Sequence, residues 1–262
     1  VPGANDVWIA ASYESIAHFD GTSWTRWNLY DTLATLNAVI WASSPTDAWA
    51  GDDGGRIAHY NGTSWTKDTN MTPFAITDIW GSSSSDIWAA SNDLAFGPGN
   101  SVPAPLHRTG GVWNIPSINF SFIGHTITAI RGSGASDVWA VGPAGFAVHY
   151  DGSAWAQVAG PGSPPDFISV VSFDSTDAWI GSTSGVWHYS GGGTWTQALA
   201  GQRINGVWGV SSGAVYAVGN GGLLWLYDGA HWTAQRPIGS ANDLLAVAGS
   251  AAGDVWAVGR NG

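Results

Sequence analysis

The chain has 262 residues, of which 44% are hydrophobic and 10% charged, and its formal net charge at pH 7 is −11. Proteins that bind the nucleic-acid backbone carry clustered Lys and Arg, and the eight basic residues here are scattered, so nucleic acid is excluded as a partner. The absence of cysteine excludes disulfides and thiol catalysis. No apolar run reaches the roughly 18 residues of a membrane-spanning helix. An acidic, Lys-poor, Trp- and Gly-rich composition predicts an extracellular or cell-surface protein.

A repeat of about forty residues organises the chain. The tripeptide Asp-x-Trp occurs six times, and a degenerate copy stands at 214–216. The aromatic residues of these seven copies are Trp8, Trp49, Trp88, Trp139, Trp179, Tyr216 and Trp256. A period of this length, with several strands in each unit, is typical of the blades of a β-propeller.

Each repeat predicts four short strands, in the order in which the chain runs. The first is apolar, at 37–41, 76–80, 127–131, 168–171, 204–208 and 244–248. The second begins at Asp-x-Trp, and the third ends in His followed by Tyr or Phe. An Asp-Gly or Asn-Gly pair then predicts a hairpin turn, because both tolerate positive φ, and the fourth strand begins at a tryptophan. The expected fold is all-β, with residues 1–262 as a single β-propeller domain of four-stranded antiparallel blades.

The number of blades is open between six and seven. The first, third and fourth strands each occur six times, whereas the second occurs seven times. In a six-bladed ring, which we favour, the inner strand at 244–248 would pair with the N-terminal strands and close the circle. In a seven-bladed ring both terminal blades would be incomplete, as in a piece of a longer chain.

The regular Trp and His positions are interpreted as scaffold. Large rings at fixed blade positions fill the wedge-shaped space between neighbouring blades, and a catalytic histidine repeated in most blades would be unusual. We expect His59 to bind a turn aspartate or a serine hydroxyl. One irregularity lies in the inner strands, where Arg131 replaces an aromatic residue. A half-buried cation needs an acidic partner, so we predict an Asp78–Arg131 contact near the channel.

The unit Asp-Val-Trp-Ala-Val-Gly, followed by His-Tyr-Asp-Gly and then Trp, resembles the repeats of two bacterial propeller families. These are the photosystem-assembly-factor type and the BNR/Asp-box type. The resemblance spans the whole chain and implies the fold, while proteins with such repeats include lectins, assembly factors and glycan-active enzymes. The hairpin at 20–24 reads Asp-Gly-Thr-Ser-Trp. It departs from the Asp-box pattern Ser-x-Asp-x-Gly-x-x-Trp, because Asp and Gly are adjacent.

A ligand site is expected where the repeat breaks. The third unit carries long connections at 92–105 and 116–126, and long loops in compact domains are often functional. Aromatic rings on loops of this face could stack on sugar rings, or could equally fasten the loops to the blades. The residues predicted to bind ligand are Tyr13, Trp27, Tyr30, Phe74, Phe96, Phe120, Phe122, His125 and Phe167.

Catalytic signatures are missing from the sequence. There is no nucleophile elbow, no His-Glu-x-x-His and no phosphate-binding glycine loop. The acidic candidates for glycan hydrolysis are Glu14, Asp31, Asp52, Asp53 and Asp93. We therefore predict a non-enzymatic, lectin-like protein that binds carbohydrate through loops on one face, without cofactor or metal. The alternatives are a protein-interaction or assembly scaffold and, third, a glycan hydrolase or lyase.

Overall fold

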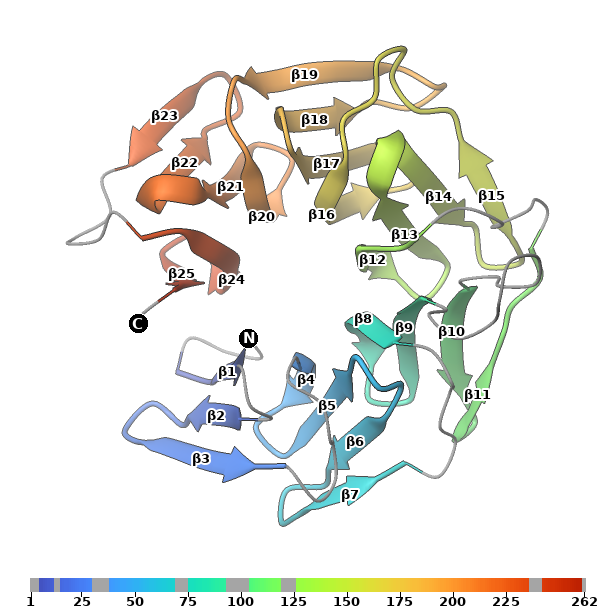
Figure 1. The fold of residues 1–262 in the computed structure, drawn as a ribbon, viewed down its shortest axis with the longest axis vertical. Helices are drawn as coiled ribbons and strands as arrows, with labels where there is room; N and C mark the ends of the chain where they lie inside the picture. The colour runs from blue at the N-terminus through green and yellow to red at the C-terminus, as the bar shows by residue number, and fades with distance from the viewer. Residues whose placement is uncertain are drawn as a thin grey trace.

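The computed structural model describes residues 5–11, 15–29, 38–68, 75–92, 104–118, 126–235 and 242–260. These residues form seven antiparallel β-sheets arranged around a central opening (Figure 1). Two short 3-10 turns, η1 (Pro143–Gly145) and η2 (Asn220–Gly222), connect strands within two of the sheets. The prediction of an all-β propeller is confirmed.

The strands fall into four layers, from the opening outward. The innermost strands are β4 (Ala38–Ser44), β8 (Ala75–Ser83), β12 (Ala129–Gly134), β16 (Phe167–Asp174), β20 (Ile204–Ser211) and β24 (Leu244–Ala251). The second strands are β1 (Val7–Ala11), β5 (Asp47–Asp52), β9 (Asp86–Asn92), β13 (Asp137–Gly142), β17 (Asp177–Ser182), β21 (Ala214–Gly219) and β25 (Asp254–Gly259). The third strands are β2 (Ser15–Phe19), β6 (Ile57–Tyr60), β10 (Ala104–Thr109), β14 (Phe146–Tyr150), β18 (Gly185–Tyr189) and β22 (Leu223–Tyr227). The outer strands are β3 (Trp24–Asn28), β7 (Trp65–Lys67), β11 (Val112–Asn114), β15 (Trp155–Val158), β19 (Trp195–Ala200) and β23 (Trp232–Gln235).

The ring has seven sheets, so the seven-bladed alternative applies in place of the favoured six. Five sheets have four strands, while the first has the order β1-β2-β3 and the last has only β24-β25 among the described residues. The inner strand β24 pairs with β25 and not with β1. The first and last sheets lie next to each other (Figure 1), and the rings of Phe19 and Trp256 are 6.0 Å apart, centroid to centroid.

The hairpins between third and outer strands are built on an Asx turn followed by glycine. In the fourth sheet the Asp151 carboxylate accepts hydrogen bonds from the backbone N–H groups of Ser153 and Ala154, at 2.9 and 3.0 Å. Gly152 has a φ of 92°, which an L side chain rarely adopts. The equivalent Asn61 makes the same two bonds to Thr63 and Ser64 without a charge.

The hydrophobic core lies between neighbouring sheets. The largest buried side chains are second-strand tryptophans such as Trp49, Trp88 and Trp139, which are at most 2% exposed. Trp88 meets Trp155 of the next sheet edge-on, with ring centroids 5.5 Å apart. Tryptophan at fixed repeat positions therefore fills the space between blades, as expected from the sequence.

Closer to the axis, an inner-strand tryptophan covers a glycine of the next sheet. A Cβ atom added to Gly132 would lie 2.7 Å from Cη2 of Trp80 and would also collide with the carbonyl oxygen of Asp137. The same contact joins Trp41 to Gly81 and Trp208 to Gly249. These glycines are required by close packing and not by backbone conformation.

Replacing such a glycine should destabilise the ring. We expect Gly132→Ala to lower the free energy of unfolding by about 1–3 kcal/mol, the range for overpacking a tight contact. Gly134→Ala is the matched control, since a Cβ there meets nothing within 4 Å. Urea unfolding measures both variants, and equal stabilities would contradict the packing argument.

The hairpin turns should make stability depend on acid pH. Hydrogen bonds from the Ser153 hydroxyl and from the backbone N–H groups of Ala154 and Ser153 lower the pKa of Asp151 from 3.8 to about 2. Because the folded-state pKa is depressed, the stabilisation is present above pH 4 and is lost as the pH falls towards 2. We expect Asp151→Asn to keep its melting temperature at pH 7, as Asn61 suggests, and to lose less stability between pH 4 and 2 than the wild type. Thermal melts across this range test the expectation, with Asp151→Ala as the variant that should melt earlier at pH 7.

Candidate functional site

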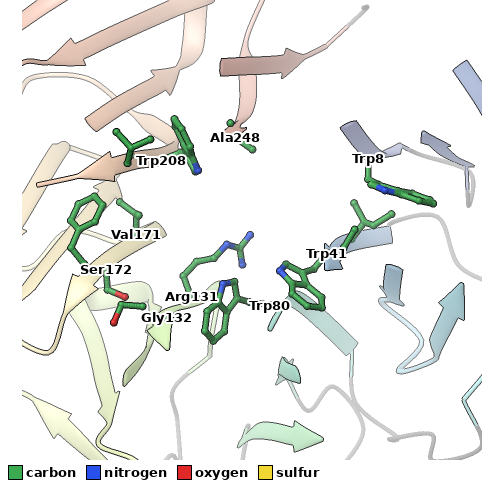
Figure 2. Close-up of a pocket in the computed structure, with 16 residues that line it drawn as sticks. Trp8, Trp41, Trp80, Arg131, Gly132, Val171, Ser172, Trp208 and Ala248 are labelled. Carbon is green, nitrogen blue, oxygen red and sulfur yellow. The ribbon is translucent and has the colours of Figure 1, made fainter. Parts of the chain in front are cut away.

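One register position recurs in the lining of the central channel, on every described inner strand. In every sheet with a first strand, this residue lies directly opposite the aromatic residue of the Asp-x-Trp motif or its degenerate copy. The six residues are Trp41, Trp80, Arg131, Val171, Trp208 and Ala248. They surround a cavity of about 500 Å³ in the middle of the ring (Figure 2).

The first sheet contributes Trp8 to the same cavity. Because no inner strand pairs with β1 among the described residues, the second-strand tryptophan itself reaches the channel. Its ring stacks on His18 at 4.1 Å and on Trp27 at 5.6 Å, which holds it in place. The channel is therefore lined by tryptophans from four sheets.

Arg131 extends into the open middle of the ring (Figure 2). Its Nη1 group binds the Asp78 carboxylate and donates to the carbonyl oxygen of Ile130 at 2.6 Å. Asp78 also accepts the backbone N–H groups of Ile79 and Ile130, both at 2.9 Å. The predicted Asp78–Arg131 contact is confirmed, and both carboxylate oxygens of Asp78 accept hydrogen bonds.

The rest of the Arg131 guanidinium is available. Its side chain is 37% exposed, and Nε and Nη2 bind no acceptor among the described residues. A second cavity of about 260 Å³ shares Arg131, Val171 and Trp208 with the first. The guanidinium therefore stands where the two cavities meet and can donate to a ligand in either.

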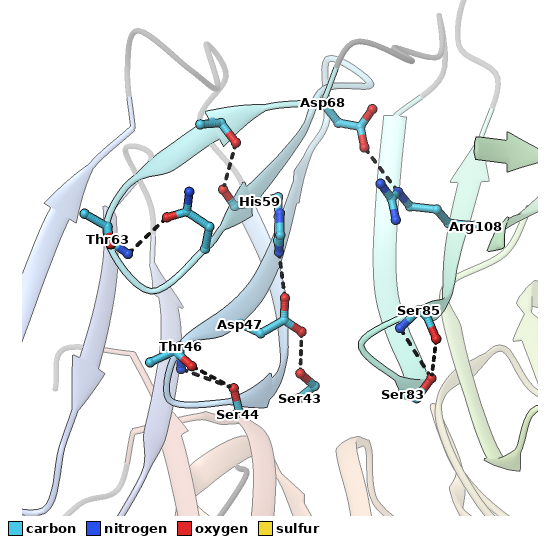
Figure 3. A network of polar contacts seen from close by, with 12 residues as sticks. Ser43, Ser44, Thr46, Asp47, His59, Thr63, Asp68, Ser83, Ser85 and Arg108 are labelled. Atoms are coloured by element: carbon cyan, nitrogen blue, oxygen red, sulfur yellow. Dashed lines mark hydrogen bonds and ion pairs between the residues drawn. The ribbon is translucent and has the colours of Figure 1, made fainter. Parts of the chain in front are cut away.

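The Ser, Asp and His that recur from repeat to repeat form a structural network. His59 Nε2 binds Asp47 Oδ1 at 2.6 Å, and Ser43 donates to the other oxygen of Asp47 (Figure 3). The His59 ring stacks on Trp49 at 4.1 Å. The same His–Asp pair occurs in five sheets, at His18–Asp6, His59–Asp47, His107–Asp86, His149–Asp137 and His188–Asp177.

This network does not match a nucleophilic triad. In a triad the histidine lies between the nucleophile and the acid, whereas here the aspartate lies between Ser43 and His59, so the histidine does not reach the hydroxyl. In the sixth sheet the aspartate and the histidine are lost together, since Ala214 replaces the acid and Leu226 stands opposite Tyr216. Joint replacement in one sheet is consistent with a purely structural unit.

Two of the nine predicted ligand residues lie in the described structure. Trp27 is half-buried and packs against Trp8 and Tyr60, while Phe167 is fully buried against Trp195 and presents no ring face to a ligand. Tyr13, Tyr30, Phe74, Phe96, Phe120, Phe122 and His125 lie outside the described residues. The structure instead brings together the channel residues, which are a different set from these nine. Of the channel residues, the sequence had singled out only Arg131, as an irregularity of the inner strands.

The acidic residues predicted from the sequence do not form a second candidate site within the described ranges. Glu14, Asp31 and Asp93 lie outside the described residues. Asp52 is buried and accepts the backbone N–H groups of Gly54 and Arg56, at 3.0 and 2.7 Å. No group of three metal-binding side chains exists within the described ranges. Those same ranges contain no helix that is long and apolar enough to cross a membrane.

The comparisons with known proteins define the class as a β-propeller. The structure is similar to that of YCF48 bound to D1 peptide, with a TM-score of 0.73 at 13% identity over 99% of this chain and 88% of that one. It is similar to the WD40 β-propeller domain of Doa1, with a TM-score of 0.74 at 8% identity over 99% and 87% of the two chains. A third similar structure is the β-propeller domain of Cps50 (Swd1) from Myceliophteria thermophila, with a TM-score of 0.67 at 10% identity over 98% and 91%. No protein-family model and no curated protein matches the sequence.

Removing Asp78 should cost more stability than removing Arg131. Asp78→Ala leaves the Arg131 cation without its acidic partner and two backbone N–H groups without their acceptor, so we expect a loss of about 2–3 kcal/mol in the free energy of unfolding. Arg131→Met leaves Asp78 bound to the same two N–H groups, so its loss should be smaller. Chemical denaturation compares the two, and the double variant should be more stable than Asp78→Ala alone. An Arg131→Met loss as large as that of Asp78→Ala would refute this ranking.

Proposed function

We propose that this chain is a non-enzymatic interaction scaffold that binds a peptide segment of a partner protein in its central channel. The observation that carries the proposal is the ring of Trp8, Trp41, Trp80 and Trp208 around the exposed guanidinium of Arg131. Trp and Arg are the residues most enriched among energetic hot spots of protein interfaces. The larger cavity, at about 500 Å³, lies within the range of ligand-binding pockets.

The chemistry of the channel suits a peptide with one apolar or aromatic side chain and nearby carbonyl groups. Asp78 neutralises much of the charge of Arg131, so long-range attraction of anions is weak. The free Nε and Nη2 groups still form a planar pair of donors that match carbonyl or carboxylate oxygens. The Cη2 and Cζ3 atoms of Trp41, Trp80 and Trp208 lie against a glycine of the next sheet, and the same three rings line the cavity that an inserted side chain would enter.

The similarity to YCF48, whose structure contains bound D1 peptide, supports a peptide as the ligand class. It is support by analogy of fold only, because the identity is 13%. The specificity of this chain must come from its own channel residues. Arg131 is the most distinctive of them, since the equivalent residues of the other five inner strands are uncharged.

A glycan hydrolase needs two carboxylates near the scissile bond. Asp78 is the one carboxylate among the described residues that line these cavities, and Arg131 with two backbone N–H groups already binds it. Carbohydrate binding through the loop face stays a prediction, since most of its residues lie outside the described ranges. A bacterial, extracellular or cell-surface location also stays a prediction.

Peptide display against the immobilised chain tests the proposal. We expect enriched peptides to lose at least tenfold in affinity against Arg131→Met, because the donors are removed, and against Ala248→Trp, because the channel is narrowed. Ala248 takes the position that tryptophan holds in three other sheets, so the substitution suits the fold. Calorimetry or fluorescence anisotropy with a selected peptide measures the change.

Arg26→Met is the matched control, since Arg26 is exposed on the outer strand β3 and lies away from the channel. Its affinity should equal that of the wild type. Peptides whose binding is indifferent to Arg131→Met and Ala248→Trp would refute the channel as the site. Binding of glycans with no enriched peptide would favour the lectin reading, and turnover of a bound glycan would favour an enzyme.

A further inference from the structure

A groove of about 560 Å³ lies between the fifth and sixth sheets, away from the central channel. Each of these neighbouring sheets has its four strands in the described structure (Figure 1). One side of the groove is lined by Trp179 and the end of β19, and the other by Trp225, Tyr227 and Trp232. None of these residues lines the channel cavities described above. We call this feature the perimeter groove.

Three rings of the perimeter groove form an arrangement that recurs at the junction of the first and second sheets. In both places a second-strand tryptophan meets the third-strand tyrosine and the first outer-strand tryptophan of the next sheet. The two centroid distances are 5.5 and 6.1 Å at the first junction, and 4.9 and 5.9 Å at the groove. The rings are Trp8, Tyr60 and Trp65 at the first junction, and Trp179, Tyr227 and Trp232 at the groove.

At the first junction a fourth ring completes the arrangement. Trp27 of β3 lies nearly parallel to Trp8, with an interplanar angle of 12° and ring centroids 5.6 Å apart. The Trp27 centroid is also 5.2 Å from that of Tyr60 and 6.4 Å from that of Trp65. The chain therefore places an indole of its own among these three rings.

The perimeter groove has no such fourth ring in the described structure. Trp27 lies three residues after the tryptophan that begins its strand, and Ala198 has the same spacing in β19. A bulge in β19 brings Leu199 beside it, and both side chains are smaller than an indole. Trp225 lines the groove but makes no ring contact with the other three rings. The position that Trp27 takes at the first junction is thus left without a ring here.

The chemistry of the groove favours a neutral ring over a cation. At the junction of the second and third sheets a guanidinium covers the second-strand tryptophan, since Arg108 lies 4.5 Å from the ring centroid of Trp49. That cation is bound by the carboxylate of Asp68, at 3.4 Å. No carboxylate is among the described residues that line the perimeter groove. A cation would therefore lack the acidic partner that Arg108 has.

The rim of the groove can also accept a hydrogen bond from an indole N–H. His231 is exposed in the turn before β23, and its imidazole has no partner among the described residues. The hydroxyl of Thr196 is exposed on the opposite side of the groove. A ligand that combines a flat apolar ring with one N–H donor fits these surroundings.

We propose that the perimeter groove binds the tryptophan side chain of a partner protein, in the place that Trp27 takes at the first junction. Tryptophan is enriched among the energetic hot spots of protein interfaces, and aromatic pairs stabilise contacts beyond the area that they bury. The groove shares no lining residue with the channel cavities, so this proposal does not depend on the proposed channel function.

N-acetyl-5-fluoro-L-tryptophanamide is the probe, and fluorine NMR of the probe titrated with the full chain measures its affinity. We expect Ala198→Trp to weaken binding at least about tenfold, because the new indole takes the place of the ligand. Ala156→Trp, exposed on β15 of the fourth sheet, is the matched control and should bind as the wild type does. Ala248→Trp narrows the channel and should leave binding in the groove unchanged.

Removing the internal indole tests the same proposal without filling the groove. Trp27→Ala should open an equivalent site at the first junction, so this variant should bind one more equivalent of the probe than the wild type. The probe should also raise its melting temperature by more than that of the wild type, because a ligand of the folded state stabilises it. Trp24→Ala is the matched control, since Trp24 is 48% exposed on the same strand and should open no site.

Three results would overturn the proposal. The first is equal affinity of the wild type and a folded Ala198→Trp variant, with no added site in Trp27→Ala. The second is tighter binding of N-acetyl-L-argininamide or a methyl glycoside than of the tryptophan probe, which would assign the groove to a cation or a sugar. The third is tighter binding of free L-tryptophan than of its capped amide, which would make the groove an amino-acid site.

Discussion

A tryptophan of the second strand, packed against a histidine of the third, is the contact on which the rest of this structure depends. The two residues are direct cross-strand partners in five sheets, and an aspartate beside the tryptophan binds the histidine ring. Because side chains alternate with a period of two, a fixed register at this one point decides which side every other residue of the sheet faces. The rings also fill the space between sheets, so a single set of side chains provides both register and packing.

The same register determines the chemistry of the channel. The inner-strand residue opposite each second-strand aromatic residue lines the channel, so this one position of each repeat contributes to the channel wall. That position holds Trp41, Trp80 and Trp208 but also Arg131, Val171 and Ala248. The scaffold positions repeat while this one varies. Variation at this register position makes the channel of a regular ring asymmetric.

The seam between the first and last sheets departs from the regular repeat. Trp8 reaches the channel because no described inner strand covers it. The seam therefore adds a fourth tryptophan to the wall of the channel.

The sequence by itself determined the strands, their order and their turns. Asp-Gly pairs, Asp-x-Trp copies and a period near forty are local signals, and each sheet is built from one contiguous segment. The Asp78–Arg131 contact could also be predicted, because a charge on an apolar strand demands a partner nearby. The structural role of the repeated Trp and His could also be predicted, because a catalytic residue would not recur in most repeats.

Only the tertiary structure decided the number of sheets and the place of the candidate site. The inner strand at 244–248 could pair with the strand that follows it or with the first sheet. Which of the two occurs depends on the angle around the axis that the six earlier sheets occupy. No single repeat encodes this geometry. The channel likewise brings Trp41 and Trp208 to one cavity. They belong to different repeats and line the same cavity only when the ring forms. The sequence predicted a site on the loops because they break the repeat, whereas the candidate site of the structure is formed by regular strands that converge on one axis.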